Sequence, residues 1–440
     1  MRWIDIILPE PGIDREFDTY IDRARDLLMD LGAVQARDGL DSPLVIECMA
    51  DIGGQLFQAV TCSDPGAFSC DPGRSSYSQP VLGRDDHDRL LGFHLVGNPD
   101  QLHLPWHWVH NGLGFLLEKH PLCAADQPLN VPAGDRARPW MQRLVRSEFL
   151  VGQDGSGTLR SILPQLRPDS AAAPEVLFVP GHTEPKMRRL IYREAEAIEL
   201  ALGAANLGDP LARLVFPTGA ITPRELSRQG LIYQAIHFAG PTSQPARIDD
   251  VQGEYWMNRL IQEAAAAPDD ALAEAAGLEG EVLGVDPVTV LLEAACERYD
   301  RNGAPDHGPA ARRSGDDLPP IGEGHPSWLL SDGPIAPESL NHGGGVPPLV
   351  FSNSFCGLPD MGPRFLAAGA STFVGPAMPL FSRPARIFAG YFYDALGDGW
   401  CAGAAVWHAA RACRQELGDG HPAWLGYGLH GYGTLALQYL

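Results

Sequence analysis

The stretch PLVFSNSFCG, which runs from Pro348 to Gly357, combines a short apolar run with a polar turn and a cysteine. Apolar, β-branched and aromatic residues bounded by proline and polar residues are typical of a buried strand. We therefore expect a strand over residues 348–351, with Cys356 just beyond its carboxyl end. In open α/β sheets, ligands bind beyond the carboxyl ends of the strands. This makes Cys356 the first candidate site residue.

The same signal recurs on both sides of this stretch. Further strands are predicted over residues 176–179, 213–216, 235–238 and 372–374, and helices over residues 192–202, 387–396 and 403–414. Strands that alternate with helices predict a mostly parallel, doubly wound α/β sheet with helices on both faces. His237 also lies near a carboxyl end, in the strand that precedes the cysteine strand.

The N-terminal part of the chain has a weaker version of the pattern. Strands are predicted over residues 3–8, 44–49 and 90–96, with an amphipathic helix around residues 21–31. We divide the chain into an N-terminal α/β subdomain, residues 1–170, and a core, residues 171–440. Residues 244–323 break the rhythm of the core with apolar and acidic helical stretches and a polar loop. We interpret them as a helical insertion between the third and fourth core strands.

Composition excludes several classes of function. Acidic residues outnumber basic ones by 55 to 33, a formal charge of -22, and this average field repels nucleic acid. No apolar run approaches the roughly 18 residues of a membrane span, and the first residues do not form an export signal. The eight cysteines are scattered, without a C-x-x-C pair. We therefore expect a cytoplasmic protein with reduced thiols that does not bind membranes.

Three histidines have a spacing that could bind a metal. His103, His107 and His110 lie within eight positions of one another, but Pro105 interrupts a helix there. We predict neither a metal site nor a bound cofactor.

Seven segments together resemble the CHAT family of caspase-like cysteine-peptidase folds, in family order over roughly residues 90–440. They are LPWHWVHNG (104–112), REAEAI (193–198), IHFAG (236–240), WLLSDG (328–333), VFSNSFCG (350–357), FLAAGASTFV (365–374) and YGLHG (427–431). The resemblance implies a caspase-like sheet, with the N-terminal subdomain as a pseudo-caspase-like half. The TPR repeats often fused to such domains do not precede this one.

The resemblance also implies a Cys/His dyad, with Cys356 as nucleophile. A thiol with an ordinary pKa is only a few per cent thiolate at neutral pH, so it needs a nearby imidazole to take the proton. In the family, that imidazole directly follows the strand matched by IHFAG. This chain has Pro241 at the position. Proline has no proton to exchange and fixes the backbone φ angle.

Other histidines could replace the missing base. His237 matches the family's first histidine, which is usually structural. His182 follows the first core strand, His307 lies in the insertion, and His325 precedes the WLLSDG segment. Each has the alternative of a packed or loop histidine without a catalytic role, and Cys356 has that of a small apolar filler.

The sequence therefore leaves several functions open. The first is a degenerate peptidase that binds a peptide or protein partner, such as an active relative or a sensor protein, in a bacterial signalling or defence system. The second is an active cysteine endopeptidase that uses Cys356 with a relocated histidine. A third is an assembly scaffold whose insertion forms the interface. Whether the chain is an enzyme, its substrate preference, its partner and its oligomeric state are all left open at this level.

Overall fold

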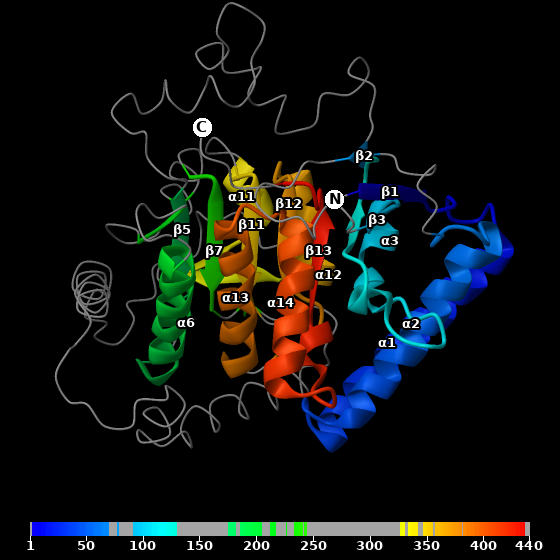
Figure 1. Ribbon diagram of the computed structural model, residues 1–440, viewed down its shortest axis with the longest axis horizontal. Helices are drawn as coiled ribbons and strands as arrows, with labels where there is room; N and C mark the ends of the chain where they lie inside the picture. The colour runs from blue at the N-terminus through cyan, green and yellow to red at the C-terminus, as the bar shows by residue number, and fades with distance from the viewer. Residues whose placement is uncertain are drawn as a thin grey trace, which may run out of the picture.

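The centre of the protein is a ten-stranded sheet, whose strands lie side by side behind a row of helices in Figure 1. The computed structural model describes residues 2–69, 77–78, 91–129, 175–181, 185–204, 212–216, 226, 233–240, 242–243, 326–330, 333–341, 346–354, 357–380 and 382–435. The strand order is β2-β1-β3-β4-β13-β12-β11-β7-β5-β6, and a second sheet has the order β10-β9-β8. Both the N-terminal and the C-terminal parts of the chain thus contribute to one continuous sheet.

The strands of the large sheet are β1 (Arg2–Ile7), β2 (Tyr77–Ser78), β3 (Leu91–Val96), β4 (Leu122–Ala125), β5 (Glu175–Pro180), β6 (Arg213–Val215), β7 (Ala235–Ala239), β11 (Leu349–Asn353), β12 (Thr372–Pro376) and β13 (Tyr427–Gly431). Those of the small sheet are β8 (Thr242–Ser243), β9 (Ser327–Leu330) and β10 (Gly333–Ile335). The helices are α1 (Arg15–Asp38), α2 (Pro43–Ser63), α3 (Pro99–Leu102), α6 (Pro185–Ala204), α11 (Pro337–Asn341), α12 (Gly357–Ala367), α13 (Ser382–Gly397) and α14 (Ala402–Leu417), with short 3₁₀ helices η3 (Trp106–Trp108), η4 (Leu116–Glu118) and η5 (Pro422–Leu425).

The large sheet consists of two parallel blocks that run in opposite directions. Strands β1, β3, β4 and β13 are parallel to one another, and so are β12, β11, β7, β5 and β6. The blocks meet at the antiparallel pair of β12 and β13, and β2 adds an antiparallel edge. The predicted mostly parallel, doubly wound α/β sheet is confirmed. Because the blocks run in opposite directions, their carboxyl ends lie at opposite edges of the sheet.

The order of the second block fixes where a site is expected. Along the sheet it reads β6-β5-β7-β11-β12, so the chain first adds a strand on one side of β5 and then continues on the other side. Such a reversal leaves a crevice beyond the carboxyl ends of the two central strands, which is where doubly wound folds bind ligands. Here those strands are β5 and β7, with β11 beside them.

Helices cover both faces of the second block. Val176 and Phe178 of β5 point into the core shared with α6 and α13, whereas Leu177 and Val179 point into a second core shared with α12 and β9. This alternation follows from the two-residue period of a strand. Helices α6, α13 and α14 stand side by side in front of the strands, and the α1–α2 hairpin lies at the N-terminal end of the sheet (Figure 1).

One predicted strand is wrong, because residues 44–49 belong to helix α2. The side chain of Ser42 caps this helix by accepting a hydrogen bond from the backbone N–H of Leu44, and Pro43 is its first residue. Val45, Met49, Ile52 and Leu56 then form its buried face. The predicted boundary at residue 170 and the insertion at residues 244–323 lie outside the described residues.

The LPWHW segment joins the N-terminal part of the chain to the C-terminal part. Trp108 Nε1 donates a hydrogen bond to the carbonyl oxygen of Leu425 in η5 (2.6 Å), and His107 Nε2 lies 3.0 Å from the same oxygen. Nearby, Arg414 of α14 pairs with Glu118 of η4 at 3.0 Å. The LPWHW segment therefore has a structural role, because it bonds the N-terminal part of the chain to η5. Within the described part of the chain, no helix is long and apolar enough to cross a bilayer.

Replacing Gly362 with alanine should destabilise the fold. Gly362 lies in α12, where a Cβ atom would overlap the imidazole ring of His430 on β13. We expect Gly362→Ala to lower the free energy of unfolding by about 1–3 kcal/mol, because helix and ring must move apart. Gly203→Ala in α6 is the matched control, since a Cβ there meets no atom within 4 Å. Urea unfolding should show the control to be neutral or slightly stabilised; equal losses in both variants would contradict this packing.

Two buried histidines should make the protein sensitive to acid. Burial lowers the pKa of His107 to about 3, and burial together with the neighbouring His107 and His103 lowers that of His430 to about 3. An unfolded histidine titrates near 6.5, so stability is complete above that pH and is lost as the pH falls toward 3. At pH 5 the loss is about 2 kcal/mol for each residue.

The variant His107→Gln tests this linkage, because a glutamine amide can still donate to the Leu425 carbonyl. The plot of unfolding free energy against pH should become shallower by about one proton between pH 6 and pH 4, or about 1.4 kcal/mol per pH unit. An unchanged slope would show that His107 is not held neutral in the folded state.

Candidate functional site

The carboxyl ends of three neighbouring strands, β5, β7 and β11, lie side by side at the edge of the sheet where the strand order predicts a ligand crevice. The backbone N–H of Gly181, just after β5, donates to Ala239 at the end of β7 (2.8 Å), and the N–H of Gly240 donates to Asn353 at the end of β11 (3.4 Å). A Cβ at Gly240 would lie 2.6 Å from the Cα of Gly181, so this approach requires a glycine.

The predicted site residues follow these ends in the sequence. His182 is next to Gly181, Pro241 is next to Gly240, and Cys356 is next to Gly357, whose N–H donates to the carbonyl oxygen of Ser354 (3.3 Å). The fold therefore brings the neighbours of all three positions to one edge of the sheet. His182, Pro241, Cys356, His307 and His325 themselves lie outside the described residues.

His237 is described, and it lies in the core rather than at the crevice. Its ring is fully buried and stacks between Phe178 (ring centroids 5.2 Å apart) and Phe351 (4.7 Å) of the neighbouring strands. Nε2 is 2.5 Å from Oε1 of Glu194 on α6, and Nδ1 is 3.2 Å from the hydroxyl of Tyr393 on α13. Both nitrogens thus face the helices that cover the sheet and are engaged there.

Hydrogen bonds engage both ring nitrogens of His237. The carboxylate of Glu194 accepts at Nε2, and burial, and then the charge of Glu194, raises the pKa of Tyr393 well above its ordinary value, so the hydroxyl that faces Nδ1 keeps its proton. In this arrangement His237 has no nitrogen left to accept a proton from a thiol. Its position is that of a residue that orders the core beneath the crevice.

Glu194 also binds the end of the cysteine strand. Asn353 Nδ2 donates to Glu194 Oε1 at 2.6 Å, and the hydroxyl of Tyr427 on β13 donates to Asn353 Oδ1. Burial, and then the charge of Glu194, raises the pKa of Tyr427 well above its ordinary value, so this hydroxyl is a donor too. A single buried carboxylate therefore links α6, β7 and β11, and Asn353 extends the network to β13.

Glu194 and Asn353 both lie in segments that resemble family motifs, but the sequence did not predict a role for either residue. One signal was available for Glu194. It lies three residues after Ile191 and four before Ile198, which places a carboxylate on the apolar face of the helix. A charge at such a position must be paired inside the protein. The identity of its partners on β7 and β11 depends on long-range pairing that no local pattern contains.

The opposite face of β11 is fixed by the WLLSDG segment. Trp328 of β9 stacks on Phe238 of β7 (4.5 Å, 7° between the planes) and donates from Nε1 to Ser352 Oγ at 2.9 Å. Ser352 Oγ is in turn 2.7 Å from Ser354 Oγ. The last described residues before Cys356 are thus held from both faces of the sheet.

The three histidines with metal-like spacing do not converge. His103 Nδ1 donates to the carbonyl oxygen of Pro359 (2.5 Å), His107 contacts Leu425, and His110 packs its ring against Phe115. Among the described residues, no group of three His, Cys, Asp or Glu side chains could hold a metal ion.

Comparison with known proteins gives weak similarities only. No family model matches the sequence, and no curated protein matches it. Among solved structures, a chain of the Saccharomyces cerevisiae separase–securin complex is similar at 8% identity and a TM-score of 0.34, covering 96% of this chain and 23% of that one. A structure described as "Structure of Protease" is similar at 8% identity and a TM-score of 0.40, covering 99% of this chain and 78% of that one. The chain thus spans less than a quarter of the separase chain.

Replacing His237 with a residue that has no ring nitrogens should destabilise the fold, because the buried carboxylate of Glu194 loses a hydrogen-bond donor. In His237→Phe the ring can keep its stack with Phe178 and Phe351, but Glu194 loses a donor. We expect the free energy of unfolding to fall by about 1.5–3 kcal/mol, as for the loss of a hydrogen bond to a charged group. Tyr393→Phe removes only the 3.2 Å bond to Nδ1 and should cost about 1 kcal/mol. Equal urea midpoints for the two variants would contradict this assignment.

Proposed function

We propose that this chain is a caspase-like protein of the CHAT type that binds a peptide or protein partner in its crevice without cleaving it. The observation that supports this most is the state of His237. Its imidazole is buried, both nitrogens are engaged by Glu194 and Tyr393, and the next strand-end position in the sequence is Pro241. The strand that should supply the base therefore offers none.

The chemistry makes the base indispensable. Cysteine proteolysis needs a thiolate to attack and a proton for the leaving amine, and an imidazole supplies both functions. Proline supplies neither. A thiol at position 356 is thus suited to packing or contact in a recognition cleft.

The setting follows from the resemblance. CHAT domains act in bacterial signalling and defence under the control of a sensing partner, so we propose a regulatory or partner-binding component of such a system. The partner is a sensor protein or an active caspase-like relative. The formal charge of -22 favours a basic segment of that partner.

Cysteine replacement tests the proposal. The purified protein, alone and with the products of neighbouring genes, should cleave no member of a peptide library, and Cys356→Ala should leave its biological effect unchanged. The reason is that recognition by shape needs no thiolate. Mass spectrometry of the library and the cellular phenotype of the variant are the two measurements.

The opposite result would identify an active endopeptidase. Cleavage that disappears in Cys356→Ala, with covalent labelling of Cys356 by an electrophilic peptide, would overturn the proposal. Replacing His182, His237, His307 and His325 one at a time would then find the base. His182 is tested first, because Gly181 beside it contacts Gly240.

A further inference from the structure

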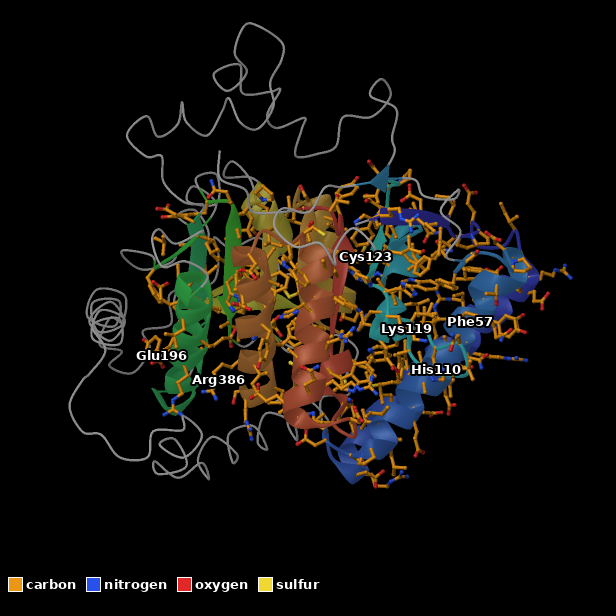
Figure 2. All side chains as sticks on the ribbon, viewed as in Figure 1. Phe57, His110, Lys119, Cys123, Glu196 and Arg386 are labelled. Atoms are coloured by element: carbon orange, nitrogen blue, oxygen red, sulfur yellow. The ribbon has the colours of Figure 1, made fainter. Side chains whose placement is uncertain are left out.

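A row of three polar side chains crosses the N-terminal block of the sheet, away from the crevice. Asp5 of β1 pairs in register with His94 of β3, and His94 pairs in register with Cys123 of β4. Residues paired directly across neighbouring parallel strands project to the same face, and such strands lie about 4.8 Å apart. A carboxylate, an imidazole and a thiol therefore stand side by side. In Figure 2, Cys123 lies between the N-terminal strands, in cyan, and the C-terminal elements, in red.

The imidazole of His94 is oriented by Asp5. The ring is fully buried, and its Nδ1 lies 2.8 Å from Oδ1 of Asp5. A carboxylate oxygen only accepts, so Nδ1 carries a proton and, in the neutral ring, Nε2 holds the lone pair. Within the described part of the chain, this buried Nε2 has no hydrogen-bond partner. Because Nδ1 faces β1, Nε2 on the opposite side of the ring faces β4, where Cys123 is the next member of the row.

The thiol of Cys123 is covered by the segment that follows β13, residues 432–435, which we call the strap. Sγ lies 3.1 Å from the position that a Cβ of Gly433 would take, and the ring centroids of Tyr432 and His94 are 6.1 Å apart. Burial raises the pKa of the Cys123 thiol well above its ordinary value, against a smaller, opposite effect of the Gly433 backbone N–H. Sγ donates to the carbonyl oxygen of Phe93 at 3.7 Å. The covered thiol is thus protonated and inert.

The strap is held by hydrogen bonds that can open without unfolding the whole chain. Thr372 Oγ1 donates to the carbonyl oxygen of Tyr432 (2.8 Å), and the N–H of Gly403 donates to the carbonyl oxygen of Gly433 (2.9 Å). Local openings of this kind cost less free energy than global unfolding. An opening of the strap uncovers Cys123 beside an imidazole that is already oriented to take its proton.

We propose that Asp5, His94 and Cys123 form a second thiol centre, which opening of the strap exposes to small disulfides of the glutathione type. His94 Nε2 takes the proton of Cys123, and the thiolate attacks one sulfur of the disulfide. A mixed disulfide forms at Cys123, the S–S bond of the reagent breaks, and the departing thiolate takes the proton from His94. Because Gly433 lies against Sγ, the mixed disulfide does not fit under the closed strap, and the modification holds the strap open.

Exchange with oxidised glutathione, mapped by mass spectrometry on the folded protein, tests the proposal. The rate at Cys123 is divided by that at Cys413, a fully buried thiol in α14 whose pKa is also raised by burial. Global unfolding exposes both thiols equally, so the ratio reports local opening. We expect Cys123 to react at least about tenfold faster than Cys413.

Two variants separate the base from the strap. In His94→Gln the amide can still donate to Asp5 but has no basic nitrogen, so the Cys123 rate should fall at least about tenfold. Loosened packing alone would favour opening and raise that rate, so a fall distinguishes proton transfer from a structural role. Thr372→Val keeps the shape of the side chain but removes its bond to Tyr432, and should raise the Cys123 rate about fivefold relative to Cys413.

The pH profile gives a second readout that a structural role would not move. Without a base, the rate should rise about tenfold from pH 7 to pH 8, as the thiolate fraction of an ordinary thiol does. The unsubstituted protein should show a much smaller rise, because His94 takes the proton. Asp126, just after β4, interacts with His94, and Cys401, before α14, interacts with Cys123. Both are the same in the two proteins, so the difference between the profiles reports His94.

Three results would overturn the proposal. Equal rates at Cys123 and Cys413 in the unsubstituted protein would exclude local opening. An unchanged or raised Cys123 rate in His94→Gln would exclude proton transfer to the imidazole, and an unchanged ratio in Thr372→Val would show that the strap does not cover the thiol. If His94→Gln fails to fold, the profile of the unsubstituted protein decides, since a rise of about tenfold between pH 7 and pH 8 would exclude the base.

Discussion

The structure depends on one buried negative charge. Glu194 lies inside the protein with its carboxylate between α6 and the sheet, where an unpaired charge would cost several kcal/mol. His237 and Asn353 pair it, and each comes from a different central strand. Removing either donor leaves the charge with fewer hydrogen bonds, which favours the observed positions of α6, β7 and β11.

That constraint decides what His237 can do. An imidazole has two nitrogens, and the network uses both, one for Glu194 and one for Tyr393. A histidine that completes the core in this way cannot also take a proton from a thiol at the sheet edge. Proton transfer from a thiol therefore needs a second imidazole, and the residue that follows Gly240 in the sequence is Pro241. Core order and proton transfer are separate tasks that need separate residues.

Local patterns were enough for most elements but not for their arrangement. Short β-branched runs predicted β5, β7, β11 and β12, because a buried strand needs only a few such residues. The same rule failed at residues 44–49, where the apolar run is one turn of helix α2 and the period appears only over Val45 to Leu56. The opposed direction of the two strand blocks depends on β13 pairing with both β12 and β4, a long-range choice that no segment encodes alone. For the site, strand ends were predictable, whereas the partners of Glu194 were not.

The opposed directions of the two blocks raise the question of how the N-terminal strands are connected to the ends of β5, β7 and β11. The carboxyl ends of β1, β3 and β4 lie at the other edge of the sheet from those of β5, β7 and β11. The N-terminal part of the chain is instead connected to β11 through the LPWHW segment. Trp108 and His107 hold the carbonyl of Leu425, and two residues later Tyr427 begins β13 and donates to Asn353. The LPWHW segment is far from β11 in the sequence, yet the hydrogen bonds at Leu425 and Tyr427 connect it to Asn353, the last residue of β11.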